Sequence, residues 1–250
     1  MTNLPTNLIC FSHLRWDFVY QRPQHLLTRF SKDYNVYFVE EPVFDSDGDA
    51  FISFSKREEN LWVGVPHLPD GLSKDDVNEL LEDLLHKFLK KEDLSKFIFW
   101  YYTPMALAFT ETFHPRLIVY DCMDELSQFK FAPPELKILE RKLLELADVV
   151  FTGGVSLYEA KKDQHDNIHA FPSSIEREHF LKARRKNAEP IDQKSIPNPK
   201  LGFYGVIDER FDIELIDKIA EKKPEWQIIL LGPVVKIDPE TLPKRTNIHY

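Results

Sequence analysis

Residues able to bind anions or to move protons follow directly after apolar, strand-like segments. The first group, Trp16, Arg22 and Gln24, lies between the apolar run at 8–12 and the helical pattern that starts near Arg22. Helix N-termini attract anions, and an arginine there can clamp a phosphate or a carboxylate. The alternative is that Trp16 closes the core and Arg22 pairs with an acid. Both interpretations stay open, and we name the three as candidate substrate-binding residues.

A second group is acidic and lies at the end of the apolar segment at 117–122 and just after it. Asp121, Asp124 and Glu125 leave a predicted buried strand together. Carboxylates at such a position can act as a general base or orient the hydroxyls of an acceptor. Helix capping by Asp124 is a competing explanation. Because clustered acids repel one another unless something uses them, we name Asp121 and Asp124 as candidate catalytic residues and Glu125 as a candidate substrate-binding residue.

A third group, Tyr102 and Thr103, ends the aromatic segment at 97–102 and opens the next helix. An aromatic face suits the apolar surface of a sugar or a base. Such a run is also typical of a buried strand without a role in binding, so both interpretations stay open. Tyr102 and Thr103 are candidate substrate-binding residues.

The fourth group follows the apolar segment at 201–206. Gly205 lets the backbone turn close to a ligand, and Arg210 can neutralise a diphosphate. The alternative is an ordinary strand-to-helix turn in which Asp212 is the N-cap. We name Gly205 and Arg210 as candidate residues for binding a donor diphosphate.

The elements that must position these groups alternate between short apolar runs and helical patterns. This alternation predicts an α/β fold with a Rossmann-like parallel sheet covered by helices on both faces. The expected strands lie at 8–12, 35–40, 51–55, 61–65, 97–102, 117–122, 149–153, 168–171, 201–206, 227–232 and 247–250, and the expected helices start near residues 22, 73, 104, 134, 155 and 213.

One segment, 184–199, is polar, contains three prolines and lacks periodicity. We interpret it as a linker between an N-terminal domain at 1–183 and the start of a second Rossmann-like domain at 200–250. The second domain would bury too little surface to be stable alone, so we expect it to be truncated.

Composition narrows the classes of function. The net charge is −9 and the pI is near 5.5, which argues against a protein that coats nucleic acid. The start resembles no signal peptide, so we expect a cytoplasmic protein. Cys10 and Cys122 lie in apolar runs and are expected to be reduced, and no spacing predicts a metal site. Basic residues at the end of the amphipathic segment 78–91 and at 182–186 leave peripheral membrane contact open.

Five segments in order resemble bacterial glycosyltransferases of the GT-B superfamily. They are WDFVYQRPQHLL, FWYYTP, VYDCMDEL, FPSSIEREHF at 171–180 and FYGVIDERFD. The resemblance implies a hexosyltransferase that moves a sugar from a UDP-, GDP- or dTDP-sugar to an acceptor hydroxyl on a glycan or lipid-linked acceptor, without a bound metal or cofactor. The usual setting is cell-envelope polysaccharide synthesis at the inner face of the membrane.

The resemblance also distributes the roles of the candidate residues. It places Arg210 and Gly205 at the leaving diphosphate, and Asp121 or Asp124 where relatives carry a histidine or an acid. The family's acidic donor motif would lie after Tyr250, so turnover by this chain is an open question. Two alternatives remain: a non-catalytic α/β binding module and an NAD-dependent sugar epimerase or reductase. The second is disfavoured because no GxGxxG or GxxxxGK[ST] fingerprint occurs.

Overall fold

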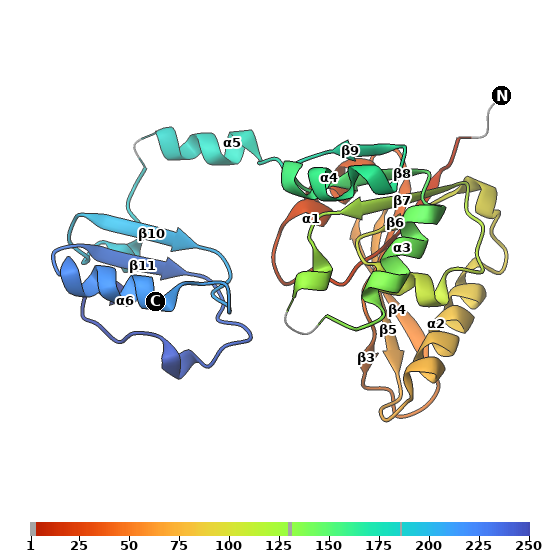
Figure 1. Cartoon of the computed structure of the whole chain (residues 1–250), viewed down its shortest axis with the longest axis horizontal. Helices are drawn as coiled ribbons and strands as arrows, with labels where there is room; N and C mark the ends of the chain where they lie inside the picture. The colour runs from red at the N-terminus through yellow and green to blue at the C-terminus, as the bar shows by residue number, and fades with distance from the viewer. Residues whose placement is uncertain (1–3, 130–131, 186) are drawn as a thin grey trace. The chain divides into compact units, whose positions relative to one another are not determined.

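The computed structural model describes residues 4–129, 132–185 and 187–250 and divides the chain into two compact units (Figure 1). Unit 1 is Met1–Ile175 and unit 2 is Glu176–Tyr250. The predicted linker at 184–199 falls within unit 2 and contains the 3-10 helix Ile191–Gln193. The Gln193 carbonyl accepts a hydrogen bond from the Lys200 ammonium at 2.6 Å.

Unit 1 is built on one sheet with the strand order β3-β5-β2-β1-β6-β7-β8-β9. All neighbours in this order are parallel, and β4 pairs antiparallel with β5. The strands are β1 (Asn7–Phe11), β2 (Asn35–Val39), β3 (Val43–Phe44), β4 (Phe51–Glu58), β5 (Leu61–Leu68), β6 (Phe97–Tyr101), β7 (Leu117–Cys122), β8 (Val149–Thr152) and β9 (Ile168–Ala170).

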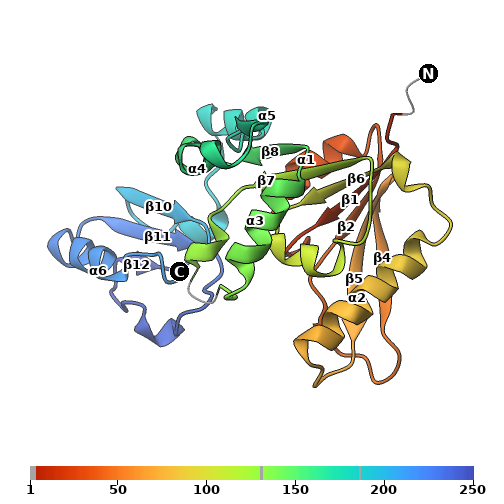
Figure 2. The same ribbon diagram turned by 45° about the vertical axis from the view of Figure 1, so that its right-hand side comes forward.

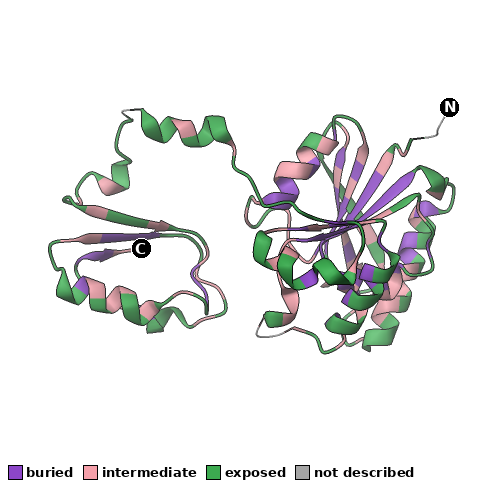
Figure 3. Cartoon of the chain, turned by 45° about the horizontal axis from the view of Figure 1, so that its top comes forward, coloured by how far each residue is buried: buried purple, intermediate pink, exposed green. Residues whose placement is uncertain are grey.

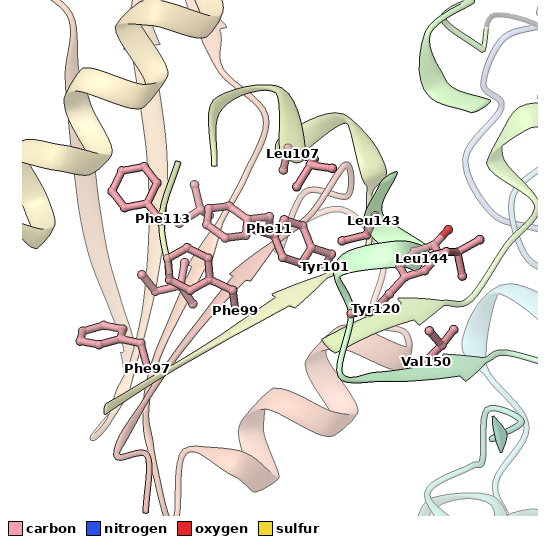
Figure 4. Close-up of a cluster of buried hydrophobic side chains, with 14 of the residues drawn as sticks. Phe11, Phe97, Phe99, Tyr101, Leu107, Phe113, Tyr120, Leu143, Leu144 and Val150 are labelled. Carbon is pink, nitrogen blue, oxygen red and sulfur yellow. The ribbon is translucent and has the colours of Figure 1, made fainter. Parts of the chain in front are cut away.

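The central strands are buried on both faces, which explains their unbroken apolar sequences. Every residue of β6 is buried, as are four of the five in β1. Because side chains alternate along a strand, Cys10 and Trp100 belong to one core cluster, whereas Phe11 and Phe99 belong to the other. Figure 3 shows the buried residues concentrated in this sheet, and Figure 4 shows the second cluster.

Helices cover the two faces unequally. Leu27 of α1 packs into the cluster that contains Cys10, whereas Leu85 of α2 and Leu143 of α3 pack into the cluster that contains Phe11. Figure 2 shows α2 and α3 on the same side of the sheet. The helices of unit 1 are α1 (Arg22–Phe30), α2 (Lys74–Leu89), α3 (Leu136–Leu146) and α4 (Val155–Lys161), with 3-10 helices η1 (Leu94–Lys96), η2 (Pro104–Phe109), η3 (Leu126–Gln128) and η4 (Lys162–Gln164).

Unit 2 has a smaller parallel sheet in the order β10-β11-β12. One helix, α6, packs on it through a cluster that includes Ala220, Ile228 and Ile248. The elements are α5 (Arg177–Phe180), η5 (Leu181–Arg184), η6 (Ile191–Gln193), β10 (Lys200–Tyr204), α6 (Ile213–Lys222), β11 (Gln227–Leu231), η7 (Pro239–Thr241) and β12 (Ile248–His249).

The predicted class, a Rossmann-like α/β fold with parallel sheets, is confirmed. Details differ. The expected strands at 51–55 and 61–65 are longer and form an antiparallel hairpin, β3 was not predicted, and the helix expected after residue 104 is a 3-10 helix. None of the described helices is both long and apolar enough to cross a bilayer.

Candidate functional site

Unit 1 has a cavity where the strand order reverses. The chain builds outward from β1 on one side through β2 and returns to the other side with β6. In open α/β sheets ligands bind at the carboxyl ends of the strands next to such a reversal. Residues one or two positions after the ends of β1, β2 and β6 line a cavity of about 280 Å³ there, namely Ser12, Glu40 and Thr103.

The wall of this cavity is mainly apolar. Three elements supply it: the strand ends, helix α2 and the 3-10 helix η2. Thr103 is buried, and its hydroxyl accepts a hydrogen bond from the Met105 amide at 3.3 Å, which starts η2 and fixes this part of the wall. The apolar lining residues are Phe11, Val39, Pro42, Phe44, Val77, Leu81, Met105, Ala106 and Phe109.

Two acids after β2, which the sequence analysis did not single out, also line the cavity. Glu40 accepts hydrogen bonds from the Trp16 amide at 2.8 Å and from the Arg15 guanidinium at 2.9 Å. The Glu41 residue is exposed to solvent at the mouth of the cavity, yet desolvation by surrounding atoms raises the pKa of its carboxyl, against the opposing charge of Arg15. Glu40 and Glu41 lie at the end of an apolar, strand-like run. Asp121 was named as a candidate because of the same pattern, so this pattern could also have identified Glu40 and Glu41.

Trp16 and Gln24 hold the loop between β1 and α1. The Gln24 amide nitrogen donates to the Trp16 carbonyl at 2.8 Å and to the Val19 carbonyl at 3.0 Å, and its oxygen accepts from the Gln21 amide at 3.0 Å. The Gln24 side chain is almost completely buried. Its polar atoms are therefore engaged inside the loop, and the Trp16 ring packs edge-on against Phe38.

Arg22 and Asp121 form a buried ion pair. The Arg22 Nε lies 2.9 and 3.1 Å from the two Asp121 oxygens, and its second terminal nitrogen lies 2.8 Å from Oδ1. The remaining nitrogen donates to the Phe171 carbonyl at 2.7 Å. Side-chain exposure is 4% for Arg22 and 0% for Asp121. All three guanidinium nitrogens thus have partners inside the unit.

Burial shapes the electrostatics of this pair. Desolvation raises the pKa of Asp121, although the hydrogen bonds and charge of Arg22 act in the opposite direction. Tyr102 is 1% exposed within the core, and desolvation followed by the charge of Asp121 raises its pKa well above the ordinary value. Its hydroxyl lies near Asp121 without a well-formed hydrogen bond. The Tyr102 ring therefore offers no open face for stacking.

The other two predicted acids differ in their surroundings. Glu125 lies 2.9 Å from the buried Lys161 ammonium and accepts from the Ser127 hydroxyl at 2.7 Å. Lys161 also contacts Glu140 at 2.9 Å. Asp124 is half-buried, and its carboxylate has no hydrogen-bonding or ion-pair partner in the described part of the chain. Among the described residues, therefore, Asp124 is the one of the three predicted acids for which no counterion is found.

The loop that carries Asp124 is fixed by its neighbour after β8. The Gly153 amide donates to the Cys122 carbonyl at 2.8 Å. A Cβ atom at Gly153 would collide with the Met123 carbonyl oxygen, whereas one at Gly154 would meet nothing. Only glycine permits this approach, so Gly153 determines where Asp124 lies.

In unit 2 the loops after β10 and β11 meet. Gly205 has a φ of +149° and Gly232 a φ of +152°, and a Cβ on Gly232 would collide with the Gly205 carbonyl oxygen. Arg210 is bound by Asp208, with 2.6 Å between a terminal nitrogen and Oδ2. Its side chain remains 64% exposed. Asp212 accepts from the Leu215 amide at 2.9 Å, so the alternative expectation that it caps α6 is confirmed.

The described residues contain no group of three or more histidine, cysteine, aspartate or glutamate side chains arranged to hold a metal ion. Cys10 and Cys122 are buried free thiols, and burial raises the pKa of Cys122 to about 12.

Comparison with known proteins gives matches to solved structures. No family model matches the chain, and no curated protein matches its sequence. Sucrose-phosphate synthase from Thermosynechococcus elongatus matches with a TM-score of 0.65 and 12% identity, covering 94% of this chain and 63% of that one. A trehalose-phosphate synthase from Burkholderia xenovorans in complex with glucose-6-phosphate gives 0.60 and 12%, covering 93% and 67%. Anabaena HepE in complex with UDP and glucose gives 0.58 and 14%, covering 92% and 62%.

The match extends to a different enzyme class. A UDP-N-acetylglucosamine 2-epimerase from Rickettsia bellii matches with a TM-score of 0.51 and 13% identity, covering 90% of this chain and 62% of that one. The chain thus spans less than two thirds of the sucrose-phosphate synthase, HepE and the epimerase. At these low identities the structural similarity shows the fold alone, and the chain has a Rossmann-like, GT-B-type fold.

Proposed function

We propose that this chain is part of a glycosyltransferase that moves a sugar from a nucleotide-sugar donor to an acceptor hydroxyl. The observation that carries the proposal is the fold match to glycosyltransferases across both units, combined with the cavity at the strand reversal of unit 1. The neighbouring HepE structure contains UDP and glucose, which supports a nucleotide sugar as donor.

The donor side of the proposal rests on unit 2. Departure of a nucleoside diphosphate requires positive charge near its phosphates. The exposed Arg210 guanidinium, oriented by Asp208, and the glycine backbone at Gly205 suit a diphosphate at the carboxyl edge of β10 and β11. Asp208 keeps Arg210 in one orientation, which reduces the conformational entropy lost on binding.

The acceptor side rests on unit 1. Asp124 is the predicted acid whose carboxylate lacks an internal counterion among the described residues, so we assign it contact with the reacting sugar or the acceptor hydroxyl. Thr103 lines the cavity and is assigned to acceptor binding. Arg22, Asp121, Glu125, Tyr102, Trp16 and Gln24 are assigned as positioning residues, because their polar atoms or rings are used inside the unit.

A nucleotide panel tests the proposal. Thermal unfolding of the chain is measured with UDP, GDP, dTDP, NAD⁺ and NADP⁺. We expect one nucleoside diphosphate to raise the midpoint and the Arg210→Ala variant to bind it roughly tenfold more weakly, because a charge-assisted hydrogen bond contributes about 1.5–3 kcal/mol. Arg245→Ala is the matched control, since that arginine pairs with Asp217 of α6 and is not part of the loop after β10.

Three outcomes would contradict the proposal. A response to NAD⁺ or NADP⁺ alone would favour the epimerase or reductase alternative, and no response to any nucleotide would favour a non-catalytic module. A diphosphate response unchanged by Arg210→Ala would remove the assigned donor site.

The cellular setting is a separate part of the proposal. Cell-envelope glycan synthesis at the inner face of the membrane is supported by exposed cations at the end of α2 and in η5, among them Lys87, Lys90, Lys182 and Arg184. Such cations favour anionic lipid surfaces. Co-sedimentation with anionic but not with neutral vesicles is the expected result, and equal recovery with both would contradict it.

A further inference from the structure

We propose that the cavity of unit 1 binds an uncharged, apolar portion of the acceptor, a ring system or short branched chain that carries the hydroxyl group, and that it excludes phosphorylated acceptors. This inference rests on the proposed glycosyltransferase function. It deepens that function by naming the class of acceptor, which neither the fold nor the structural matches determine.

The size of the cavity sets the first limit on its ligand. Its volume is about 280 Å³. An apolar cavity of about 150 Å³ in another protein is large enough for benzene. The space in unit 1 therefore suits roughly one fused two-ring system or a branched chain of comparable volume.

The chemistry of the wall sets the second limit. Apolar side chains come from three directions: Phe11 and Val39 from the strand ends, Val77 and Leu81 from α2, and Ala106 and Phe109 from η2. A free sugar exposes hydroxyls on most of its surface, and hydroxyls buried against such a wall without partners cost free energy. An apolar group loses nothing there and gains from leaving water.

Charge sets the third limit. The ionisable side chains among the described lining residues are Glu40, Glu41 and Lys74. Lys74 forms an ion pair with Glu135, and Glu40 with Arg15. A phosphate entering this cavity would meet the Glu41 carboxylate, and it would have to compete with Glu40 for Arg15 and with Glu135 for Lys74. Phosphate recognition normally relies on arginine or lysine, so the wall disfavours an anionic acceptor.

Glu41 gives the apolar ligand a fixed orientation. It lies on the loop after β2 at the carboxyl edge and lines the cavity together with Thr103. A carboxylate accepts hydrogen bonds, and an apolar ligand with a single hydroxyl satisfies it without adding charge. We assign Glu41 as the group that accepts the hydrogen bond of the acceptor hydroxyl, which leaves Asp124 the contact with the reacting sugar.

A matched pair of ligands tests the inference without any nucleotide sugar. The probes are 2-naphthol and 2-naphthyl phosphate, which share one ring system and differ in charge. Binding to the chain is followed by naphthyl fluorescence and by saturation-transfer NMR at pH 7. We expect 2-naphthol to bind at least tenfold more tightly than its phosphate, and Glu41→Gln to narrow this difference.

Variants locate the binding. Val77→Phe fills the cavity and is expected to weaken 2-naphthol binding at least tenfold, whereas Val155→Phe adds the same side chain at an exposed position on α4 and should leave binding unchanged. Phe44→Ala removes part of the wall at a position that is 48% exposed, and we expect severalfold weaker binding. It keeps the test decisive if Val77→Phe unfolds.

Three results would overturn the inference: no 2-naphthol binding, tighter binding of the phosphate, or binding that neither Val77→Phe nor Phe44→Ala affects. None of these depends on nucleotide binding. Failure here combined with a diphosphate response in the nucleotide panel would leave the proposed function intact and remove only the acceptor class.

Discussion

The Asp121 carboxylate accepts three hydrogen bonds from the Arg22 guanidinium inside unit 1, with nitrogen-to-oxygen distances of 2.8, 2.9 and 3.1 Å. Ninety-nine positions separate the two residues along the chain. The pair joins the end of β7 to the first residue of α1, and the Phe171 carbonyl joins the same guanidinium to the chain after β9. One arginine thus connects three segments at the carboxyl edge of the sheet.

We expect loss of either partner to destabilise unit 1. Asp121→Asn leaves the Arg22 charge buried without a counterion. Arg22→Met likewise leaves the Asp121 carboxylate buried without a counterion. Removing one member of a buried pair typically costs about 3–5 kcal/mol. Urea unfolding measures the change, and the double variant should lose less than the sum of the two single variants. Arg57→Ala, at an exposed pair with Asp17, should cost less than about 1 kcal/mol.

An Asp121→Asn variant with wild-type stability and lost transfer activity would contradict the positioning role. It would restore Asp121 as a candidate catalytic residue.

Glu125 should make stability depend on pH in the acid range. Desolvation raises its pKa, but the hydrogen bonds from Lys161 and Ser127 outweigh this and leave the pKa below the ordinary value. A lowered folded-state pKa stabilises the protein above the unfolded value, which is about 4.3. This contribution is lost as the pH falls through the folded value.

The measurement compares wild type with Glu125→Gln by urea unfolding. The difference in the free energy of unfolding should be constant between about pH 6 and 8 and should shrink below about pH 4. Glu145→Gln, at an exposed position on α3, is the control. A difference that grows as the pH falls would contradict the assigned direction.

Gly153 should be intolerant of any side chain. A methyl group there collides with the Met123 backbone, so Gly153→Ala requires the loops after β7 and β8 to separate. Forced packing of this kind costs roughly 1–3 kcal/mol. Gly154→Ala, with open space around its Cβ, is the adjacent control. Thermal unfolding of both variants checks the prediction, and equal midpoints would contradict it.

Asp124→Asn should leave stability unchanged and slow sugar transfer. Removal of a group that acts in proton transfer typically lowers the rate by about 10²–10⁴-fold. Asp33→Asn, an exposed acid next to the amino end of β2, is the control and should keep wild-type rates. Equal rates for the two variants would exclude Asp124 from the reaction.

Sequence patterns predicted the fold better than the roles of the residues. Runs such as 8–11 in β1 and 97–101 in β6 predict buried parallel strands because their side chains are apolar or aromatic. By contrast, the same polar types after a strand serve opposite purposes: Asp124 lacks an internal partner in the described residues, while Asp121 has Arg22. Charge pairing across 99 positions leaves no local pattern. The apolar cavity could not be predicted from the sequence either. Its wall comes from strand ends, α2 and η2, and the apolar residues of each segment have the pattern of an ordinary hydrophobic core.

The most direct test of the central claim measures donor consumption. The chain is incubated with UDP-, GDP- and dTDP-sugars, with and without 2-naphthol, and phosphorus NMR follows release of the nucleoside diphosphate. The account predicts that one donor releases its nucleoside diphosphate, that 2-naphthol accelerates the release, and that Asp124→Asn suppresses it. Intact donors in every incubation, with a folded chain that binds none of the nucleotides, would contradict the assignment as a glycosyltransferase.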